Sequence, residues 1–222
     1  MMSRDEYWRA WSAVHQDIDP SSSLWIRGYL RVVYPIARGA HNLRITPNVV
    51  TASGIGVSAA LIWSATQSSP WLMMMLMLLG IATDAIDGAL AIGQNKTTLF
   101  GGVFDSVVDR INEAALVIAL LIVAGFDFIG VAMLAFTLVL IMEYMRARAH
   151  AALSSVTELI TVWERPTRVI VSIAAVIAGM FTETFLNFSL QKVSIIALSV
   201  WIALGIAGNV QLVRHLYRQL AA

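Results

Sequence analysis

The sequence contains no cysteine, and only 13% of its residues carry a formal charge. Without cysteine the chain has no disulfide, no thiol nucleophile and no zinc–thiolate site. The charged share is about half that of an ordinary soluble protein, too small to cover the surface of a 24.2 kDa globule. The net charge is only +1, so the chain has no overall positive field for binding nucleic acid.

Apolar residues are abundant instead, at 58% of the chain. This excludes a disordered chain and predicts an all-α, polytopic membrane protein, because each apolar stretch approaches the roughly 20 residues that cross a bilayer as a helix. We expect six transmembrane helices, at 48–67, 70–92, 102–125, 127–147, 168–187 and 193–214.

The basic residues predict how these helices are oriented. Of the 15 lysines and arginines, only Lys192 falls on the face opposite to the others, so both termini are expected to be cytoplasmic, in a multi-pass protein of the cell membrane. Residues 22–43 predict an amphipathic helix in the cytoplasmic interface; an ordinary soluble helix is the alternative. The chain is therefore divided into a cytoplasmic segment, 1–46, and a six-helix membrane domain, 47–218.

Four aspartates stand within two of the apolar stretches. Asp84 and Asp87 are three residues apart, and Asp105 and Asp109 are four apart, so each pair shares one face of its helix. A carboxylate facing lipid costs about 3 kcal/mol, so these four should face inward. Too few lysines and arginines lie nearby in the sequence to pair with all four aspartates. Arg110 is expected on the side of its helix opposite to Asp105.

Converging carboxylates without cationic partners predict a divalent metal site. Ligands that are all oxygen favour Mg²⁺, Mn²⁺ or Ca²⁺ over zinc or copper, and four carboxylates are enough for two ions in a phosphoryl displacement. We expect two Mg²⁺ ions, with Mn²⁺ as the alternative. The other interpretation is a set of helix-end acids bonded to backbone amides. Glu113, one turn beyond Asp109, is expected to orient it or to hold a basic partner, whereas Glu143 has no assigned role.

The stretch from Asp84 to Asp109 resembles the signature of the CDP-alcohol phosphotransferase (CDP-alcohol phosphatidyltransferase) family, D-x2-D-G-x2-A-R-x8-G-x3-D-x3-D. The matching positions are Asp84, Asp87, Gly88, Ala91, Gly101, Asp105 and Asp109. Ile92 departs, since the family has arginine there. Segments 37–51, 144–151 and 164–168 resemble actinobacterial phosphatidylinositol phosphate synthases, and the resemblance covers about 31–218.

The resemblance implies a reaction. CDP-diacylglycerol would bind through its pyrophosphate on two Mg²⁺ ions held by the four aspartates, and Asp109 would also be the general base toward an acceptor hydroxyl, with CMP leaving. The cytidine nucleotide would be held by the residues that match the family's binding positions: Asn48, Val49, Val50, Thr51, Gly88 and Thr98. Ile92 can neither hydrogen-bond nor carry charge, so Lys96 or another group would substitute, or nucleotide affinity or activity would be reduced.

Arginines gather at the cytoplasmic ends of the last three stretches: Arg146, Arg148, Arg165, Arg168 and Arg214. Such a cluster suits a phosphate, although positive-inside anchoring and lipid headgroup contact also explain it. In the resembled synthases the positions matching Arg165 and Arg168 bind the phosphate of inositol phosphate. The expected acceptor is therefore 1D-myo-inositol 3-phosphate, giving phosphatidylinositol phosphate; glycerol 3-phosphate, giving phosphatidylglycerol phosphate, is the alternative.

Two other function classes remain open from the residues alone. A cation transporter would use the same acids, but they cluster near one face and no acids mark an exit path. A weakly active homologue is suggested by Ile92. Small residues at Ala52, Gly54, Gly56 and Ala59 permit close helix contact and, with the resemblance, suggest a homodimer.

Overall fold

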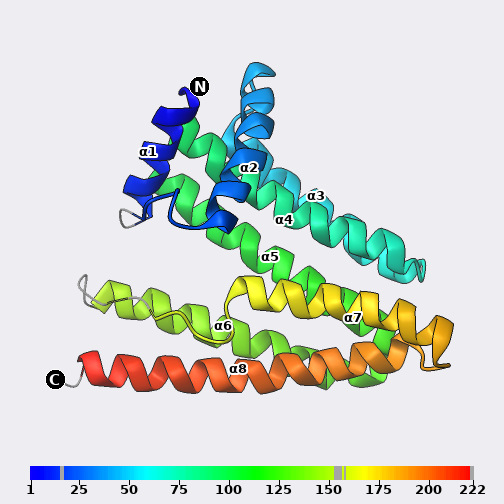
Figure 1. Cartoon of the computed structure of the whole chain (residues 1–222). Helices are drawn as coiled ribbons and strands as arrows, with labels where there is room; N and C mark the ends of the chain where they lie inside the picture. Colours follow the sequence, from blue (N-terminus) through cyan, green and yellow to red (C-terminus); the bar gives the residue numbers. More distant parts are fainter. Residues whose placement is uncertain (16–17, 153–156, 158, 221–222) are drawn as a thin grey trace. The chain divides into compact units, whose positions relative to one another are not determined.

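The computed structural model describes residues 1–15, 18–152, 157 and 159–220, and every regular element in these ranges is helical (Figure 1). The elements are α1 (Arg4–Val14), α2 (Leu24–Asn42), α3 (Pro47–Thr66), α4 (Pro70–Gly93), α5 (Leu99–Ala124), the short 3₁₀ helix η1 (Phe126–Phe128), α6 (Ile129–Ala152), α7 (Arg165–Phe185) and α8 (Leu190–Leu220). The all-α prediction is confirmed.

The transmembrane prediction is confirmed in part. Five helical segments are long and apolar enough to cross a membrane: Pro47–Thr66, Pro70–Gly93, Phe126–Ala152, Arg165–Phe185 and Leu190–Leu220. The expected third span is a helix, α5, but it is not among the five; within it stand Asp105, Asp109, Arg110 and Glu113. The chain is a multi-pass membrane protein, and the sixth span stays a prediction.

The chain forms two compact units, with the division falling within α3, α4 and α5. The first unit comprises Met1–Val57 and Leu78–Asn112, and the second comprises Ser58–Met77 and Glu113–Ala222. The first half of α3, the second half of α4 and the first half of α5 thus belong to the same unit as α1 and α2. The predicted division at residue 46 stays a prediction.

The first unit has an apolar cluster built by α1, α2 and the end of α4. The cluster's buried members are Tyr7, Trp11, Leu30, Val33, Tyr34, Ala37, Ala89 and Leu90. Helix α1, which the sequence reasoning missed, begins with a capping box: the Ser3 backbone N–H donates to Glu6 Oε2 at 2.8 Å, and the Ser3 hydroxyl caps the Glu6 backbone N–H. A capping box satisfies two otherwise orphan donors, and Tyr7 and Trp11, four apart, share the buried face.

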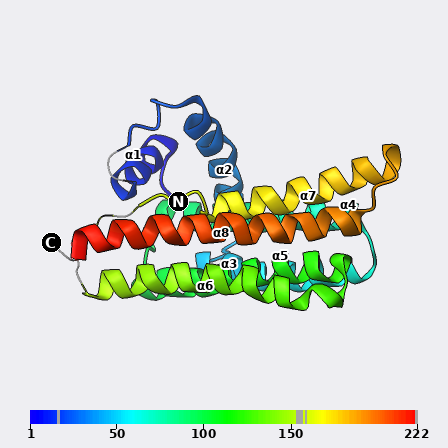
Figure 2. The same ribbon diagram turned by 90° about the horizontal axis from the view of Figure 1, so that it is seen from below.

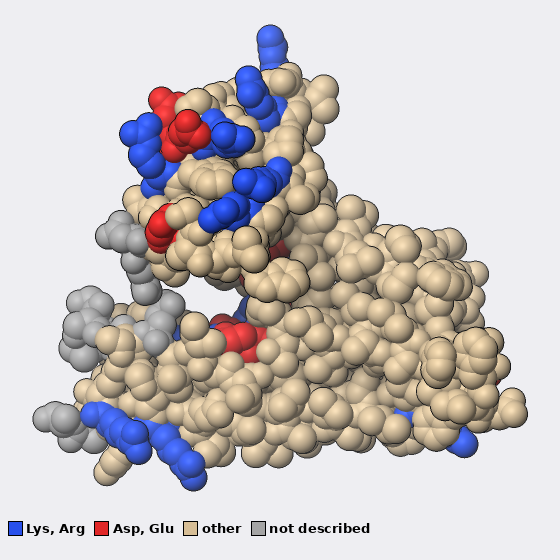
Figure 3. Space-filling view, viewed as in Figure 1, with Lys and Arg blue, Asp and Glu red and all other residues tan. Residues whose placement is uncertain are grey.

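Helix α2 confirms the helix expected over 22–43 and carries two apolar faces. One packs in the cluster, and the other is exposed at Trp25, Tyr29, Val32 and Ile36. The exposed arginines of α1 and α2 gather over the same part of the molecule (Figure 3). An apolar stripe flanked by arginines is typical of a helix in a membrane interface, which stays a prediction.

In the second unit α8 packs along both α6 and α7 (Figure 2). Trp163 and Trp201 are fully buried there and meet edge to face, with ring centroids 5.1 Å apart. A Cβ at Gly208 would lie 2.6 Å from the Trp163 Cβ, so glycine is required for the segment before α7 to pack on α8. This contact fixes the residues that precede Arg165.

Candidate metal and phosphate sites

The carboxylates of α4 and α5 converge in the first unit. Asp84, Asp105 and Asp109 each offer an oxygen, and the three oxygens all lie within 4.8 Å of one another. Three of the four predicted carboxylates, one from α4 and two from α5, therefore come together. All three side chains are partly buried.

Asp87 lies beside this group and not in it. It is 7% exposed, its side chain is in hydrogen-bonding contact with Thr51 of α3, and it feels the charges of Asp84 and Asp105. Thr51 is itself buried and donates to the Pro47 carbonyl at 3.1 Å. Asp87 thus joins α4 to the first turn of α3 while staying close to the other acids.

Packing between α3 and α5 sets where the acids stand. A Cβ at Gly54 would lie 3.3 Å from Val108 Cγ1, so glycine lets α3 approach α5 next to Asp109. Gly54 therefore packs within its own chain, whereas a Cβ at Gly56 would meet nothing within 4 Å. The homodimer suggested from these small residues stays a prediction.

The arrangement of charge fits a divalent cation. Two full charges 4.8 Å apart repel by about 3 kcal/mol at an effective dielectric constant of ~20, and three carboxylates contribute three such pairs. Arg110 Nη2 lies 4.0 Å from Asp109 Oδ2, which offsets part of this repulsion. Hard oxygen donors at this spacing are the ligands that Mg²⁺, Mn²⁺ and Ca²⁺ prefer.

The residues expected to hold the nucleotide have different local roles. Asn48 to Thr51 form the first turn of α3, and Thr98 Oγ1 caps α5 by accepting from the Gly101 backbone N–H at 3.0 Å. A Cβ at Gly101 would lie 3.0 Å from Thr98 Oγ1 and 3.5 Å from Asn48 Oδ1, while one at Gly88 would meet nothing within 4 Å. The face of Gly88 is thus open to an approaching group.

Ile92, where the family signature has arginine, packs against the apolar cluster of α1 and α2. The side chain is partly buried there. An apolar residue at position 92 is therefore explained by packing against the N-terminal helices. The signature alone does not reveal this packing.

Tyr29 of α2 is a neighbour of the acids that the sequence reasoning missed. Burial raises the pKa of its hydroxyl, and the negative charges of Asp84 and Asp87 raise it further. No motif in the sequence marks this residue.

In the second unit the structure gives Arg168 partners inside the protein. The guanidinium is fully buried and pairs with Glu113. It also donates from Nη2 to Glu143 Oε1 at 3.0 Å, and from Nε and Nη2 to the Trp163 carbonyl at 3.1 and 2.8 Å. Glu113 thus holds a basic partner, as one of its two expected roles required, and Glu143 gains a role.

Arg146 is likewise bound to a carboxylate. Its Nη1 and Nη2 atoms donate to the two oxygens of Glu164 at 3.0 and 2.5 Å, and Nη2 also reaches the Leu159 carbonyl at 3.4 Å. Glu164 Oε1 further accepts from the Thr161 backbone N–H at 2.7 Å and from its hydroxyl at 2.8 Å. Burial alone would raise the pKa of Glu164, but these hydrogen bonds outweigh it and hold the pKa below the ordinary value of 4.5.

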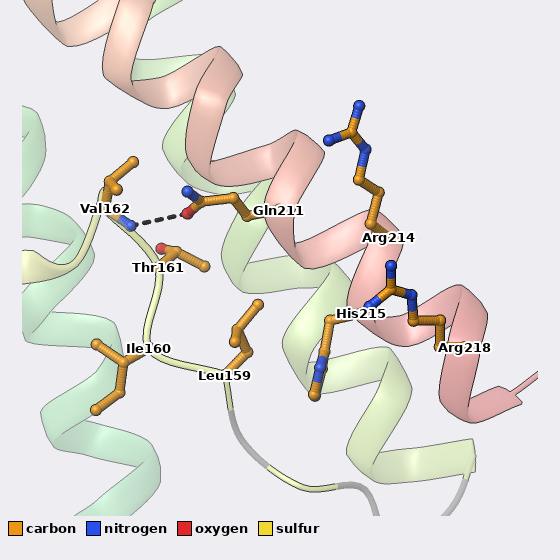
Figure 4. A pocket seen from close by; sticks show the side chains of 8 residues that line it. All are labelled: Leu159, Ile160, Thr161, Val162, Gln211, Arg214, His215 and Arg218. Atoms are coloured by element: carbon orange, nitrogen blue, oxygen red, sulfur yellow. Dashed lines mark hydrogen bonds between the residues drawn. The ribbon is translucent and has the colours of Figure 1, made fainter.

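The segment that Glu164 anchors forms one wall of a pocket of about 490 Å³ (Figure 4). Its lining comprises Leu159, Ile160, Thr161, Val162, Gln211, Arg214, His215 and Arg218. The Val162 backbone N–H donates to Gln211 Oε1 at 3.0 Å, which joins the segment to α8. Of the predicted arginines, Arg214 lines this pocket; Arg148 is exposed on α6 and Arg165, partly buried, begins α7.

Comparison with known proteins gives consistent matches. A family model described as CDP-alcohol phosphatidyltransferase matches residues 44–208. The phosphatidylinositol phosphate synthase of Corynebacterium glutamicum is 31% identical over 158 residues, 67% of this chain and 71% of that protein. The archaetidylinositol phosphate synthase of Pyrococcus horikoshii is 29% identical over 75% of this chain and 84% of its own length. The match to the Mycolicibacterium smegmatis phosphatidylinositol phosphate synthase spans 59% of that protein.

Solved structures share the fold. Mycobacterium tuberculosis phosphatidylinositol phosphate synthase with CDP-DAG bound superimposes with a TM-score of 0.70 at 23% identity, covering 84% of this chain and 94% of that one. The same enzyme in complex with manganese and citrate gives 0.69. Helices α1 and α2 both precede the residues that the family model matches.

Proposed function

Because this chain belongs to the CDP-alcohol phosphatidyltransferase family, we propose that it transfers the phosphatidyl group of CDP-diacylglycerol to 1D-myo-inositol 3-phosphate, giving phosphatidylinositol phosphate and CMP. The observation that carries the proposal is the convergence of Asp84, Asp105 and Asp109 from two helices at the spacing of the family signature. The relatives are named as synthases of archaetidylinositol phosphate and of phosphatidylinositol phosphate, which favours this acceptor over glycerol 3-phosphate.

Four aspartates would hold two divalent ions, with Mg²⁺ expected and Mn²⁺ as the alternative. Bound there, the ions would neutralise pyrophosphate charge and favour the displacement. Asp109 is the proposed general base. It would accept the proton of the acceptor hydroxyl as that oxygen bonds to the β-phosphorus of the donor. The bond from the β-phosphorus to the bridging oxygen breaks, and CMP leaves with the electron pair.

The nucleotide would lie against the first turn of α3 and the start of α5. Gly88 leaves space for its approach, and Asn48 and Thr98 flank the same position near Gly101. We include Val49, Val50 and Thr51 in this donor site because they share the turn. Thr51 would act there through its contact with Asp87.

For the acceptor phosphate we propose Arg214 as a direct ligand, with Arg148 and Arg165 as further contributors. A pocket of about 490 Å³ is of the size that holds a small polar ligand, and guanidinium groups bind phosphate through paired hydrogen bonds. Arg146 and Arg168 would act indirectly, since their guanidinium groups are bound to carboxylates and carbonyls. Their proposed role is to hold the residues around that pocket.

The membrane arrangement is part of the proposal. The bias of basic residues supports a cytoplasmic position for both termini and the active site, and α2 would rest its exposed apolar stripe in the interface. A sixth span, α5, would carry its acids toward the protein interior, because carboxylates facing lipid are costly. We expect a homodimer, and the partner face is unassigned.

The test uses the purified chain in detergent with CDP-diacylglycerol and Mg²⁺. CMP release is compared for inositol 3-phosphate, free inositol and glycerol 3-phosphate. We expect release with inositol 3-phosphate, loss of release after chelation, and a loss of about 10²-fold or more in Asp109→Asn. Asp127→Asn, an exposed acid in η1, is the matched control. Release with glycerol 3-phosphate alone would overturn the acceptor, and no release from folded protein would overturn the activity.

A further inference from the structure

A separate pocket of about 370 Å³ lies in the first unit and is polar. Its wall combines Arg44 and Lys96 with the side chains of His41, Asn42, Thr46 and Gln94. No carboxylate is among the described residues that line it. The wall therefore offers hydrogen-bond donors and positive charge.

Two turns of the backbone bring the cations together. Arg44 lies between α2 and α3 with φ of 61°, and Lys96 follows Asn95, whose φ is 52°, between α4 and α5. Left-handed backbone costs a non-glycine residue about 1 kcal/mol or more, so neither turn is the default conformation. Gln94 Nε2 donates to the Ile45 carbonyl at 3.2 Å and ties one turn to the other.

Neither cation has a carboxylate partner among the residues that the structure describes. Two positive side chains in one pocket repel each other, and an anion would remove that repulsion. Helix α3 begins at Pro47, directly after Thr46, and the start of a helix adds partial positive charge. Amide, hydroxyl, ammonium and guanidinium donors together are those that bind phosphate oxygens.

Both turns lead along the chain into residues of the expected donor site. Asn48 follows Thr46 by two residues, and Thr98 follows Lys96 by two. Ile92, the departure from the signature, packs in the apolar cluster and leaves this chain without the signature's arginine.

We propose that Arg44 and Lys96 bind a phosphate group at this pocket. The phosphate of the CDP donor is one source, in which case the inference rests on the proposed function. The headgroup of an anionic phospholipid is the other source, and it presents the same chemistry at the interface. With either ligand, Arg44 and Lys96 supply positive charge on this side of the site, where the chain has no arginine at position 92.

The sequence offers a direct test, because Lys96 and Lys192 are its two lysines. The purified chain in zwitterionic detergent is treated with an amine-reactive reagent, and the acylation rates of both lysines are followed by mass spectrometry. The probes are CDP with Mg²⁺, inorganic phosphate, and mixed micelles containing phosphatidylglycerol. Arg44→Gln is compared with Arg31→Gln, which removes an exposed cation from α2.

We expect a phosphate ligand to slow acylation at Lys96 and leave Lys192, which is exposed in α8, unchanged. In Arg44→Gln, the loss of one charge-assisted contact should lower the affinity of the protecting ligand about tenfold. In Arg31→Gln, the affinity should be unchanged. Protection by CDP assigns the donor as the source; protection by phosphatidylglycerol alone assigns a lipid headgroup.

Unchanged acylation of Lys96 with all three probes would overturn the proposal, and the two cations would then serve only the carboxyl-terminal ends of α2 and α4. Protection that survives in Arg44→Gln would overturn it as well. CMP release measured on the same preparation separates the two proposals. Release without protection refutes the pocket alone, and protection without release refutes the transfer reaction alone.

Discussion

Replacing Glu164 by glutamine tests whether the wall of the Arg214 pocket depends on one carboxylate. Glu164 accepts two hydrogen bonds from Arg146, at 3.0 and 2.5 Å, and two from Thr161, at 2.7 and 2.8 Å. Glutamine keeps one acceptor oxygen and turns an NH₂ group toward Arg146 or Thr161, which are donors themselves. The change therefore removes the charge of the pair and at least one of its bonds.

The magnitude follows from the geometry. A hydrogen bond to a charged group contributes about 1.5–3 kcal/mol, and the Glu164 and Arg146 side chains are only 25% and 24% exposed, so solvent screens the pair incompletely. A loss of about 2 kcal/mol corresponds to a roughly thirtyfold shift toward conformations in which the segment leaves its place. The acceptor KM in CMP release should rise by about tenfold to thirtyfold, with the donor KM unchanged.

The pH dependence of the same contact has a definite sign. Glu164 has a pKa below its ordinary value of 4.5 because the hydrogen bonds from Arg146 and Thr161 outweigh burial. A lowered pKa in the folded state stabilises the fold fully above the unfolded pKa, and that contribution is lost as pH falls through the folded value. The wild type should therefore lose thermal stability below about pH 4.5 more steeply than Glu164→Gln does.

Glu183→Gln is the matched control, since Glu183 is exposed near the other end of α7. An unchanged acceptor KM in Glu164→Gln would refute the role of the carboxylate. An equal rise of donor and acceptor KM would also refute it, because a specific wall of the acceptor pocket should not affect the nucleotide.

Three further substitutions probe the packing around the sites, each read as thermal unfolding in detergent. Arg168→Met should destabilise by about 3 kcal/mol or more because it leaves two glutamates without their buried cation, whereas the exposed Arg148→Met should change little; equal effects would contradict the buried network. Ile92→Arg restores the signature but should destabilise by about 2 kcal/mol or more, since it places a charge in an apolar cluster; a more stable or more active variant would show that the packing is not what excludes arginine. Gly208→Val should cost about 1–3 kcal/mol because its Cβ would meet Trp163 at 2.6 Å; an unshifted unfolding temperature would show that the two segments separate freely.

The helices and the acids were predictable because their signals are local. Apolar runs and the periodicity of 3.6 residues set the long helices, and the spacings of Asp84 with Asp87 and of Asp105 with Asp109 set their shared faces. Helix α1 was not predicted, because the helix at 22–43 was the one helix expected within the segment 1–46. The signal was nonetheless present in Tyr7 and Trp11, four residues apart, after the Ser3–Glu6 capping box.

The roles of the arginines were not predictable from sequence, because they depend on partners far along the chain. Arg168 pairs with Glu113, 55 residues away, and Arg146 with Glu164, 18 residues away. A cation at a cytoplasmic helix end was assigned to phosphate binding by its type and depth alone. In the structure, some of these cations are bound to a carboxylate, as Arg146 and Arg168 are, and others have no carboxylate partner among the described residues.

That division has a consequence for ligand binding. Where phosphate binding would pull a buried guanidinium away from its carboxylate, breaking that pair costs about 3–5 kcal/mol. Arg44, Lys96 and Arg214 line pockets and have no carboxylate partner among the described residues, so no such cost opposes an anion there. Since phosphate binding by a charged donor contributes about 1.5–3 kcal/mol, only cations of this second kind retain a net gain. We therefore expect Arg168 to act as part of the scaffold, and Arg44, Lys96 and Arg214 to bind ligands.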